Sequence, residues 1–322
     1  MKKVILSFLL LIGLTNGGYT WGFYGHKLIN RMAVFTLPES LLLFYKNNIE
    51  YITEHSVDPD KRRYSVPDEA PRHYVDLDHY EQLAPVDTVP KYWKDAVAKY
   101  TEDTLKAYGI VPWHIHTMKF RLIEAFKEKN IDKILKNSAD IGHYIADAHV
   151  PLHASENYNG QLTGQHGIHG FWESRLPELF SENYDFFVGR AMYINDVLGL
   201  AWKASESSFA AKDSVLTFER LLNGTFDSDK KYTLEQKGQT QVKVYSKEYS
   251  KAYNQLLGNQ VENRMRMSII AIGSVWYTCW VDAGQPDLTG IKTTNIMDEE
   301  RKKTISAEQQ LMQERKMIGR EE

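Results

Sequence analysis

Apolar residues recur at helical spacing along most of the chain. Between residues 131 and 148 a stripe of small and aliphatic side chains repeats every three or four positions, which predicts a helix. The same spacing predicts helices over 27–37, 91–108, 113–129, 171–184, 187–209, 215–226 and 247–281, and one or two short helices over 39–56. The polar segment 227–243 is expected to be a surface loop, and we find no convincing strand pattern. The sequence therefore predicts an all-α fold, a single multi-helix domain.

The first twenty residues have the pattern of a secretory signal. Two lysines follow Met1, an apolar run covers 4–14, and small polar residues lead to Thr20. The apolar run is too short for a comfortable membrane span, although an uncleaved anchor or a buried first helix is the alternative. We expect 1–20 to be removed and the protein to be periplasmic or secreted. The domain then covers 21–288, and a charged tail covers 289–322.

Composition adds two constraints. The chain is 43% hydrophobic with a formal net charge of -3, which is ordinary for a globular protein, and no basic stripe demands a nucleic acid partner. Cys279 is its single cysteine, so an exported chain can form no internal disulfide. Stability must therefore come from the hydrophobic core and from any bound metals.

Two pairs of histidine and carboxylate residues are candidate metal ligands. His143 and Asp147 are four residues apart and project from one face of the helix predicted over 131–148. Pro151 ends that helix, so His153 leaves on a turned chain that can reach a neighbouring position. His169 and Glu173 repeat the spacing at a second helix start, and imidazole with carboxylate suits zinc best. Each histidine alone could equally be a hydrogen-bonded core residue; the two pairs together favour metal.

Further candidate ligands lie nearer the N-terminus. If the signal is cleaved after Thr20, the amine and carbonyl oxygen of Trp21 can join His26 as ligands, although Trp21 could instead be a core aromatic. An irregular loop with two prolines leads to His73, and long loops in compact domains are usually functional or mobile. Four aspartates surround His73 in the sequence, and the residues alone do not choose among them: Asp58, Asp60, Asp68 and Asp76.

Taken in order, these motifs resemble the superfamily of zinc-dependent phospholipases C and single-strand-specific zinc nucleases. The resemblance is carried by Trp21-Gly-x-x-Gly-His26, Asp58, His73-Tyr-x-Asp76, His143-x-x-x-Asp147-x-x-x-Pro-Leu-His153 and His169-x-x-x-Glu173. It implies an all-helical domain that holds three zinc ions. The implied ligands of the first ion are Asp58, His73, His143 and Asp147; of the second, His153, His169 and Glu173; of the third, Trp21, His26 and a bridging Asp147.

The resemblance also implies the chemistry. Asp58 is preferred over Asp60 because its distance ahead of His73 resembles the family spacing, and Asp58 and Asp147 are the predicted catalytic residues. Two close zinc ions that share Asp147 can lower the pKa of a bridging water to near neutral, so that hydroxide attacks the phosphate. The charges at 61–63 and 72 are expected to be solvated rather than bound to phosphate, and His149 to hydrogen-bond internally.

The substrate is less determined than the metals. Glu173 and the aromatic final helix favour a phospholipase C-like enzyme that acts on a phospholipid headgroup, whereas Trp172 favours the nucleases. The alternative is therefore a single-strand-specific zinc endonuclease or nucleotidase. Tyr74 and Asp76 suit either, since they could grip a choline-like cation or a nucleobase. A third reading is a non-catalytic exported protein stabilised by zinc, and no obligate protein partner is implied.

Overall fold

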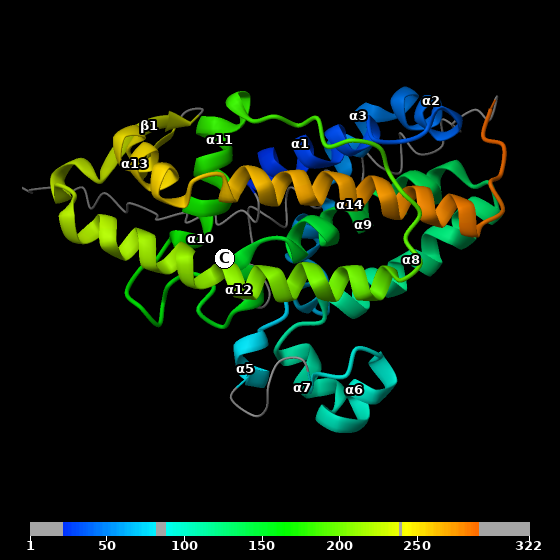
Figure 1. The fold of residues 1–322 in the computed structure, drawn as a ribbon, viewed down its shortest axis with the longest axis horizontal. Coiled ribbons are helices and arrows are strands. Elements are labelled where there is room, and N and C mark those ends of the chain that lie inside the picture. The colour runs from blue at the N-terminus through cyan, green and yellow to red at the C-terminus, as the bar shows by residue number, and fades with distance from the viewer. Residues whose placement is uncertain (1–21, 82–87, 238–239, 290–322) are drawn as a thin grey trace, which may run out of the picture.

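A computed structural model of the chain describes residues 22–81, 88–237 and 240–289. Long helices build the body of the molecule, and α12 and α14 run along its long axis (Figure 1). The all-α prediction is confirmed, with one small two-stranded sheet added. The main helices are α1 (Gly22–Val34), α8 (Val111–Lys127), α9 (Ile131–Ala148), α12 (Val197–Thr225) and α14 (Gln260–Asp282).

Shorter elements surround these helices, and α5, α6 and α7 form a small group at one side (Figure 1). The shorter α-helices are α2 (Glu39–Asn47), α3 (Ile49–His55), α4 (Asp58–Arg62), α5 (Leu77–Glu81), α6 (Trp93–Tyr100), α7 (Glu102–Ala107), α10 (Ile168–Gly170), α11 (Leu176–Phe180) and α13 (Lys247–Leu257). The tighter or wider turns are η1 (Ala70–Arg72), η3 (Pro151–Ala154), the π-helix η4 (Phe171–Arg175), η5 (Ser181–Asn183) and η6 (Ser228–Lys230).

Helix α9 lies at the centre of the fold and contacts α1, α3, α8, α12 and α14. Its N-terminus is capped by Asn130, whose side chain accepts a hydrogen bond from the backbone N–H of Lys133 at 3.0 Å. Every residue from Ser138 to Ala148 is buried, so no face of this half of the helix meets solvent. Tyr45 and Trp276 stack on each other, and both hydrogen-bond to Ser138. The polar residues of α9 must therefore find partners inside the protein.

Several predicted helix boundaries were wrong. The segment 91–108 forms two helices, because Thr101 between them has a φ of 70°. The segment 247–281 also divides, at Gly258 with a φ of 58°. No helix covers 184–196, where the chain is extended, and the predicted helices over 187–209 and 215–226 are replaced by the single helix α12.

The surface loop predicted over 227–243 was also wrong. Strands β1 (Tyr232–Lys237) and β2 (Thr240–Tyr245) form an antiparallel pair in which Tyr232 lies opposite Tyr245. The ring of Tyr245 stacks on Phe171, with centroids 3.8 Å apart. This aromatic contact fixes the hairpin to the body of the protein, and the mostly polar sequence concealed it.

Some predictions cannot be compared with the structure. The signal segment 1–20, Trp21 and the tail from 290 lie outside the described residues. Among the described helices, none combines the length and apolar character that crossing a membrane requires.

Close packing between α1 and α9 depends on Gly142. A Cβ added there would lie 2.0 Å from Oδ1 of Asn30, a buried side chain whose amide donates to the carbonyl of His26. Asn30 cannot turn away without losing its hydrogen bond to His26. Gly142 therefore sets how near His26 comes to the next residue of α9, His143.

We predict that Gly142→Ala destabilises the protein by about 1–3 kcal/mol, because overpacking a rigid contact forces the helices apart. The measurement is the denaturant midpoint of unfolding. Gly224→Ala is the matched control: Gly224 is exposed in the last turn of α12 and a Cβ there meets nothing within 4 Å, so this change should leave the midpoint unchanged or raise it slightly. Equal midpoints for the two variants would contradict the prediction.

Candidate metal centre

Four imidazole rings surround the carboxylate of Asp147 on α9. Oδ1 lies 3.3 Å from Nε2 of His26 and 3.8 Å from Nδ1 of His153. Oδ2 lies 2.9 Å from Nδ1 of His73 and 3.1 Å from Nε2 of His143. All five side chains are buried. The prediction that His143 and Asp147 share a helix face is therefore confirmed, and the structure brings His26, His73 and His153 to the same place.

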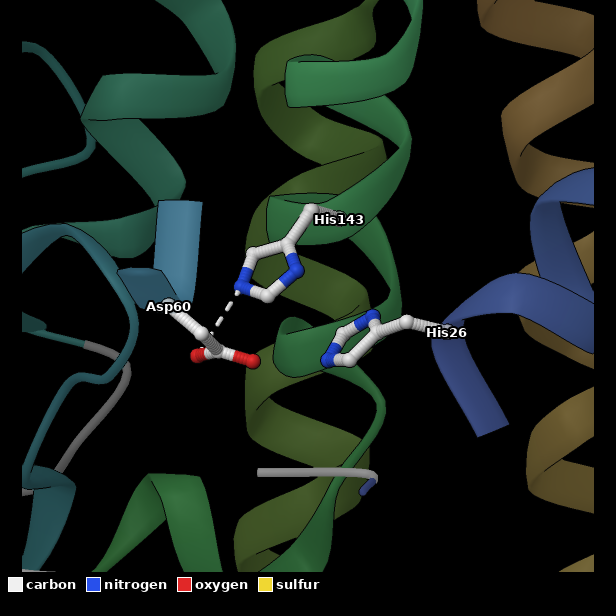
Figure 2. Close-up of side chains that lie close together, drawn as sticks. All are labelled: His26, Asp60 and His143. Carbon is white, nitrogen blue, oxygen red and sulfur yellow. Dashed lines mark ion pairs between the residues drawn. The ribbon is translucent and has the colours of Figure 1, made fainter. Parts of the chain in front are cut away.

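Asp60, and not Asp58, completes this group. Figure 2 shows the carboxylate of Asp60 facing His143, with His26 beside it. Oδ1 of Asp60 lies 3.5 Å from Nε2 of His143 and 3.7 Å from Nδ1 of His73. The rings of His26 and His143 stack with centroids 3.9 Å apart. Segments from α1, α4 and α9 thus converge here.

Asp58 points to a different set of partners. Its carboxylate bonds to His55 and, at 2.7 Å, to Nζ of Lys61. Burial alone would raise the pKa of Asp58, but the hydrogen bonds and charges of His55 and Lys61 outweigh it and lower the pKa to about 2. The structure therefore does not place Asp58 beside His73, where the family resemblance predicted it.

A second group lies beside the first. Nε2 of His169 is 2.9 Å from Oε2 of Glu173 and 3.1 Å from Nε2 of His153. His153 connects the two groups, because its Nδ1 faces Asp147 while its Nε2 lies 3.5 Å from Glu173. Glu173 is on the π-helix η4, a rare turn that occurs often at functional sites. The second predicted pair is thus assembled as expected.

Backbone carbonyls orient two of the rings. Nδ1 of His143 donates to the carbonyl of Ser56 at 2.8 Å, and Nδ1 of His153 donates to the carbonyl of His73 at 2.7 Å. These bonds place the proton on Nδ1 and leave each Nε2 as the lone pair that faces the cluster. Both rings are therefore held in the tautomer that a cation requires.

The charges of the cluster depend strongly on burial. Burial lowers the pKa of His26, and the neighbouring His143 lowers it further. Burial also acts to lower the pKa of His73, but Asp147 and Glu69 outweigh it and raise that pKa to about 9. Burial opposes ionisation of Asp147, yet His143 and His153 hold its pKa well below the usual range. The surroundings therefore favour the ionised form of Asp147.

Several polar atoms of the cluster lack hydrogen-bond partners in the described part of the chain and are placed as ligands of a cation would be. Both ring nitrogens of His26 and Oδ1 of Asp147 are buried, yet none hydrogen-bonds to any residue that the structure describes. Nε2 of His169 lies 3.1 Å from Nε2 of His153 and 2.9 Å from Oε2 of Glu173, so three possible donor atoms converge within reach of one cation. Among the described residues, three groups of side chains have the spacing of a metal site: His26, Asp60 and His143; His73, His143 and Asp147; His153, His169 and Glu173. Nitrogen and oxygen donors of this kind suit zinc.

A comparison with protein families agrees with this geometry. The model of the family described as zinc dependent phospholipase C matches residues 25–234, which is more than half of the chain. The chain belongs to the zinc-dependent phospholipase C family. A search of curated proteins found no match. Membership of the zinc-dependent phospholipase C family confirms the resemblance seen in the sequence and identifies the chain as a phospholipase C-like zinc enzyme.

Other predictions for this phospholipase C-like enzyme had mixed outcomes. His149 donates from Nδ1 to the carbonyl of Ile145 at 2.8 Å, which confirms its internal role, and burial lowers its pKa to about 4. The prediction of a solvated charge run was wrong. Arg63 is only 1% exposed, and Arg62 forms ion pairs with Glu69 and Asp140. Arg72 pairs with Glu69, and Lys61 pairs with Asp58.

Sequence reasoning missed Glu69. This carboxylate is 0% exposed and accepts a hydrogen bond from the hydroxyl of Tyr144. It lies in the loop between Pro67 and Pro71, where the sequence has no periodicity that would predict burial. Its distance of four residues from His73 was the available signal, the same spacing as in the two recognised pairs.

Proposed function

We propose that this protein is an exported phosphodiesterase with a trinuclear zinc centre, acting on phospholipids in the manner of a phospholipase C. The observation that supports it is the position of Asp147, whose two oxygens face different histidines of one continuous buried cluster. A shared carboxylate is a suitable bridge between neighbouring ions. A structural zinc site, by contrast, is closed and needs no cluster.

The proposed ligand sets combine the observed groups with the family resemblance, and Asp60 replaces Asp58 because it lies near His73 and His143. Trp21 and the signal segment lie outside the described residues, so the third set rests on His26, Asp147 and the family resemblance. The sets are Asp60, His73, His143 and Asp147 for the first ion; His153, His169 and Glu173 for the second; Trp21, His26 and the bridging Asp147 for the third.

The division of work between metal and protein is then clear. Zinc, when bound, supplies a water of lowered pKa as nucleophile and positive charge against the phosphate oxygens. The chain keeps the ligands dry and fixed: the buried end of α9 carries Asp147, and backbone carbonyls hold His143 and His153 in one tautomer. Preorganisation of this kind lowers the cost of reaching the transition state.

The structure weakens the sequence argument for a nucleic acid substrate. Trp172 is fully buried and its Nε1 donates to Gln260 at 3.0 Å, so this indole is a core residue. Tyr74 and Asp76 are also buried, at 6% and 5% exposure. Burial removes Trp172 as an argument for the nucleases, and the matched family is one of phospholipases C, so a phospholipid headgroup is the preferred substrate.

The first prediction separates the two aspartates. Wild-type protein should bind close to three zinc ions, and Asp60→Asn should lose about one of them, because the variant has a weaker oxygen donor at the position that faces His73 and His143. Asp58→Asn is the matched control and should keep the full complement, since Asp58 bonds to His55 and Lys61. Elemental analysis of dialysed protein gives the answer. Metal loss in Asp58→Asn alone would restore the original assignment.

A second prediction concerns processing. If cleavage exposes the amine of Trp21, protein that retains extra N-terminal residues should lack one ion and most of its activity. Mass spectrometry of the exported protein identifies the mature terminus. A fully active protein that begins anywhere other than Trp21 would refute the amine as a ligand.

The third prediction concerns the substrate. Zinc-loaded mature protein should hydrolyse phosphatidylcholine and release a phosphorylated headgroup, and chelator should abolish the activity until zinc is restored. The parallel assays use single-stranded DNA, single-stranded RNA and a bis-aryl phosphodiester, which should also be cleaved because the chemistry does not depend on what flanks the phosphate. Degradation of nucleic acid with intact lipid would favour the nuclease alternative. If none is cleaved, the protein is not the proposed enzyme.

A further inference from the structure

Glu69 is a buried carboxylate directly behind His73. Its Oε1 lies 3.8 Å from Nε2 of His73, while Nδ1 of the same ring faces Asp60 and Asp147. The ring therefore has a carboxylate on each side. One side is the proposed metal centre, and the other is closed by the protein.

Glu69 is held in place by charged groups from several segments. Its Oε2 lies 2.5 Å from Nη1 of Arg72, and Oε1 lies 3.5 Å from Nη2 of Arg62 and accepts from Tyr144. Arg62 follows α4 residue Asp60 by two positions, and Tyr144 directly follows His143. A buried charge is tolerated only when it is paired in this way. The network thus connects Glu69 to the three segments that carry Asp60, His73 and His143.

His73 differs from the two rings whose rear nitrogen is oriented by a backbone carbonyl. His143 and His153 donate to neutral carbonyl oxygens, whereas the rear nitrogen of His73 faces an ionised side chain. Glu69 lies 3.8 Å away, beyond hydrogen-bond distance, so it acts on the ring through its charge. Once a cation takes the lone pair of Nδ1, that charge favours the remaining proton on Nε2. It also makes the imidazole a stronger donor to a metal.

We propose that Glu69 is a positioning residue that acts through His73, fixing its tautomer and strengthening its bond to the proposed zinc ion. This inference rests on the proposed metal centre. Glu69 lies at the opposite nitrogen of His73 from Asp60, so it is not assigned a catalytic role. Its contribution is to the affinity and the geometry of one ion.

The test is the variant Glu69→Gln, which keeps the size of the side chain and a carbonyl that can accept from Tyr144 but removes the charge. Zinc affinity, measured by competition with a chromophoric chelator, should fall about 10- to 100-fold for one ion. The visible spectrum of the cobalt-substituted protein should change, because it reports the geometry around the ion. At full zinc loading kcat should fall while KM for the lipid stays unchanged.

Asp140→Asn is the matched control. Asp140 pairs with the same Arg62 and is similarly buried, and its ion pairs are with Arg62 and Lys136 rather than with His73. This variant should lower the melting temperature and leave zinc affinity unchanged. An equal loss of zinc affinity in both variants would overturn the inference, because the effect would then belong to the network as a whole. Unchanged affinity in Glu69→Gln would overturn it as well.

A measurement on the wild-type protein covers the case in which Glu69→Gln fails to fold. Nitrogen-15 NMR of zinc-loaded protein with labelled histidine should show His73 protonated on Nε2, and a proton on Nδ1 would overturn the inference. If the wild-type protein binds no zinc after incubation with it, the proposed metal centre itself is refuted. The two failures are therefore distinguishable.

Discussion

The structure depends on one ionised carboxylate held away from water among four imidazoles. Transferring a charge into a protein interior costs far more free energy than a single hydrogen bond returns, so Asp147 requires several positive or polarised partners. They come from four separate segments: α1 supplies His26, the loop after η1 supplies His73, α9 itself supplies His143, and η3 supplies His153. The fold brings these four histidines together around Asp147.

The surrounding core keeps that point rigid. Tyr45 and Trp276 fix α9 by bonding to Ser138, five residues before His143. Gly142 allows α1 to approach closely, and the carbonyl of Ser56 orients His143 from behind. Packing and hydrogen bonding therefore act on the same short stretch of α9. A substitution that weakens this packing or these hydrogen bonds should therefore displace the histidines of the cluster.

The sequence predicted the long helices and the paired ligands because both depend on local spacing. His143 with Asp147, and His169 with Glu173, were found since residues four apart meet on a helical turn. The choice between Asp58 and Asp60 was not local. Helix α4 has only five residues, and successive residues turn by about 100°, so residues two apart point to nearly opposite sides. No apolar stripe in so short a helix indicates which side faces His73.

Long-range pairing was equally inaccessible from the sequence. Glu69 lies in a loop without periodicity, and its partner Tyr144 is on the central helix. Arg63 was read as solvated because three basic residues adjoin, yet it is buried. Such burial is decided by which segments meet in space, and a single sequence records those contacts only indirectly. The charged tail from 290 and the signal segment are a different case, since they lie outside the described residues.

The hairpin of β1 and β2, which the sequence did not predict, contacts a residue close to the site. Arg175 follows Glu173 by two residues on the π-helix, and its guanidinium makes two hydrogen bonds to Glu235 of β1, at 2.9 and 2.6 Å. Its Nε also donates to the carbonyl of Tyr245 at the end of β2. Paired, nearly parallel bonds of this kind fix orientation as well as distance. The hairpin therefore acts on Glu173 through Arg175: it restrains the turn that presents this carboxylate to His169 and His153.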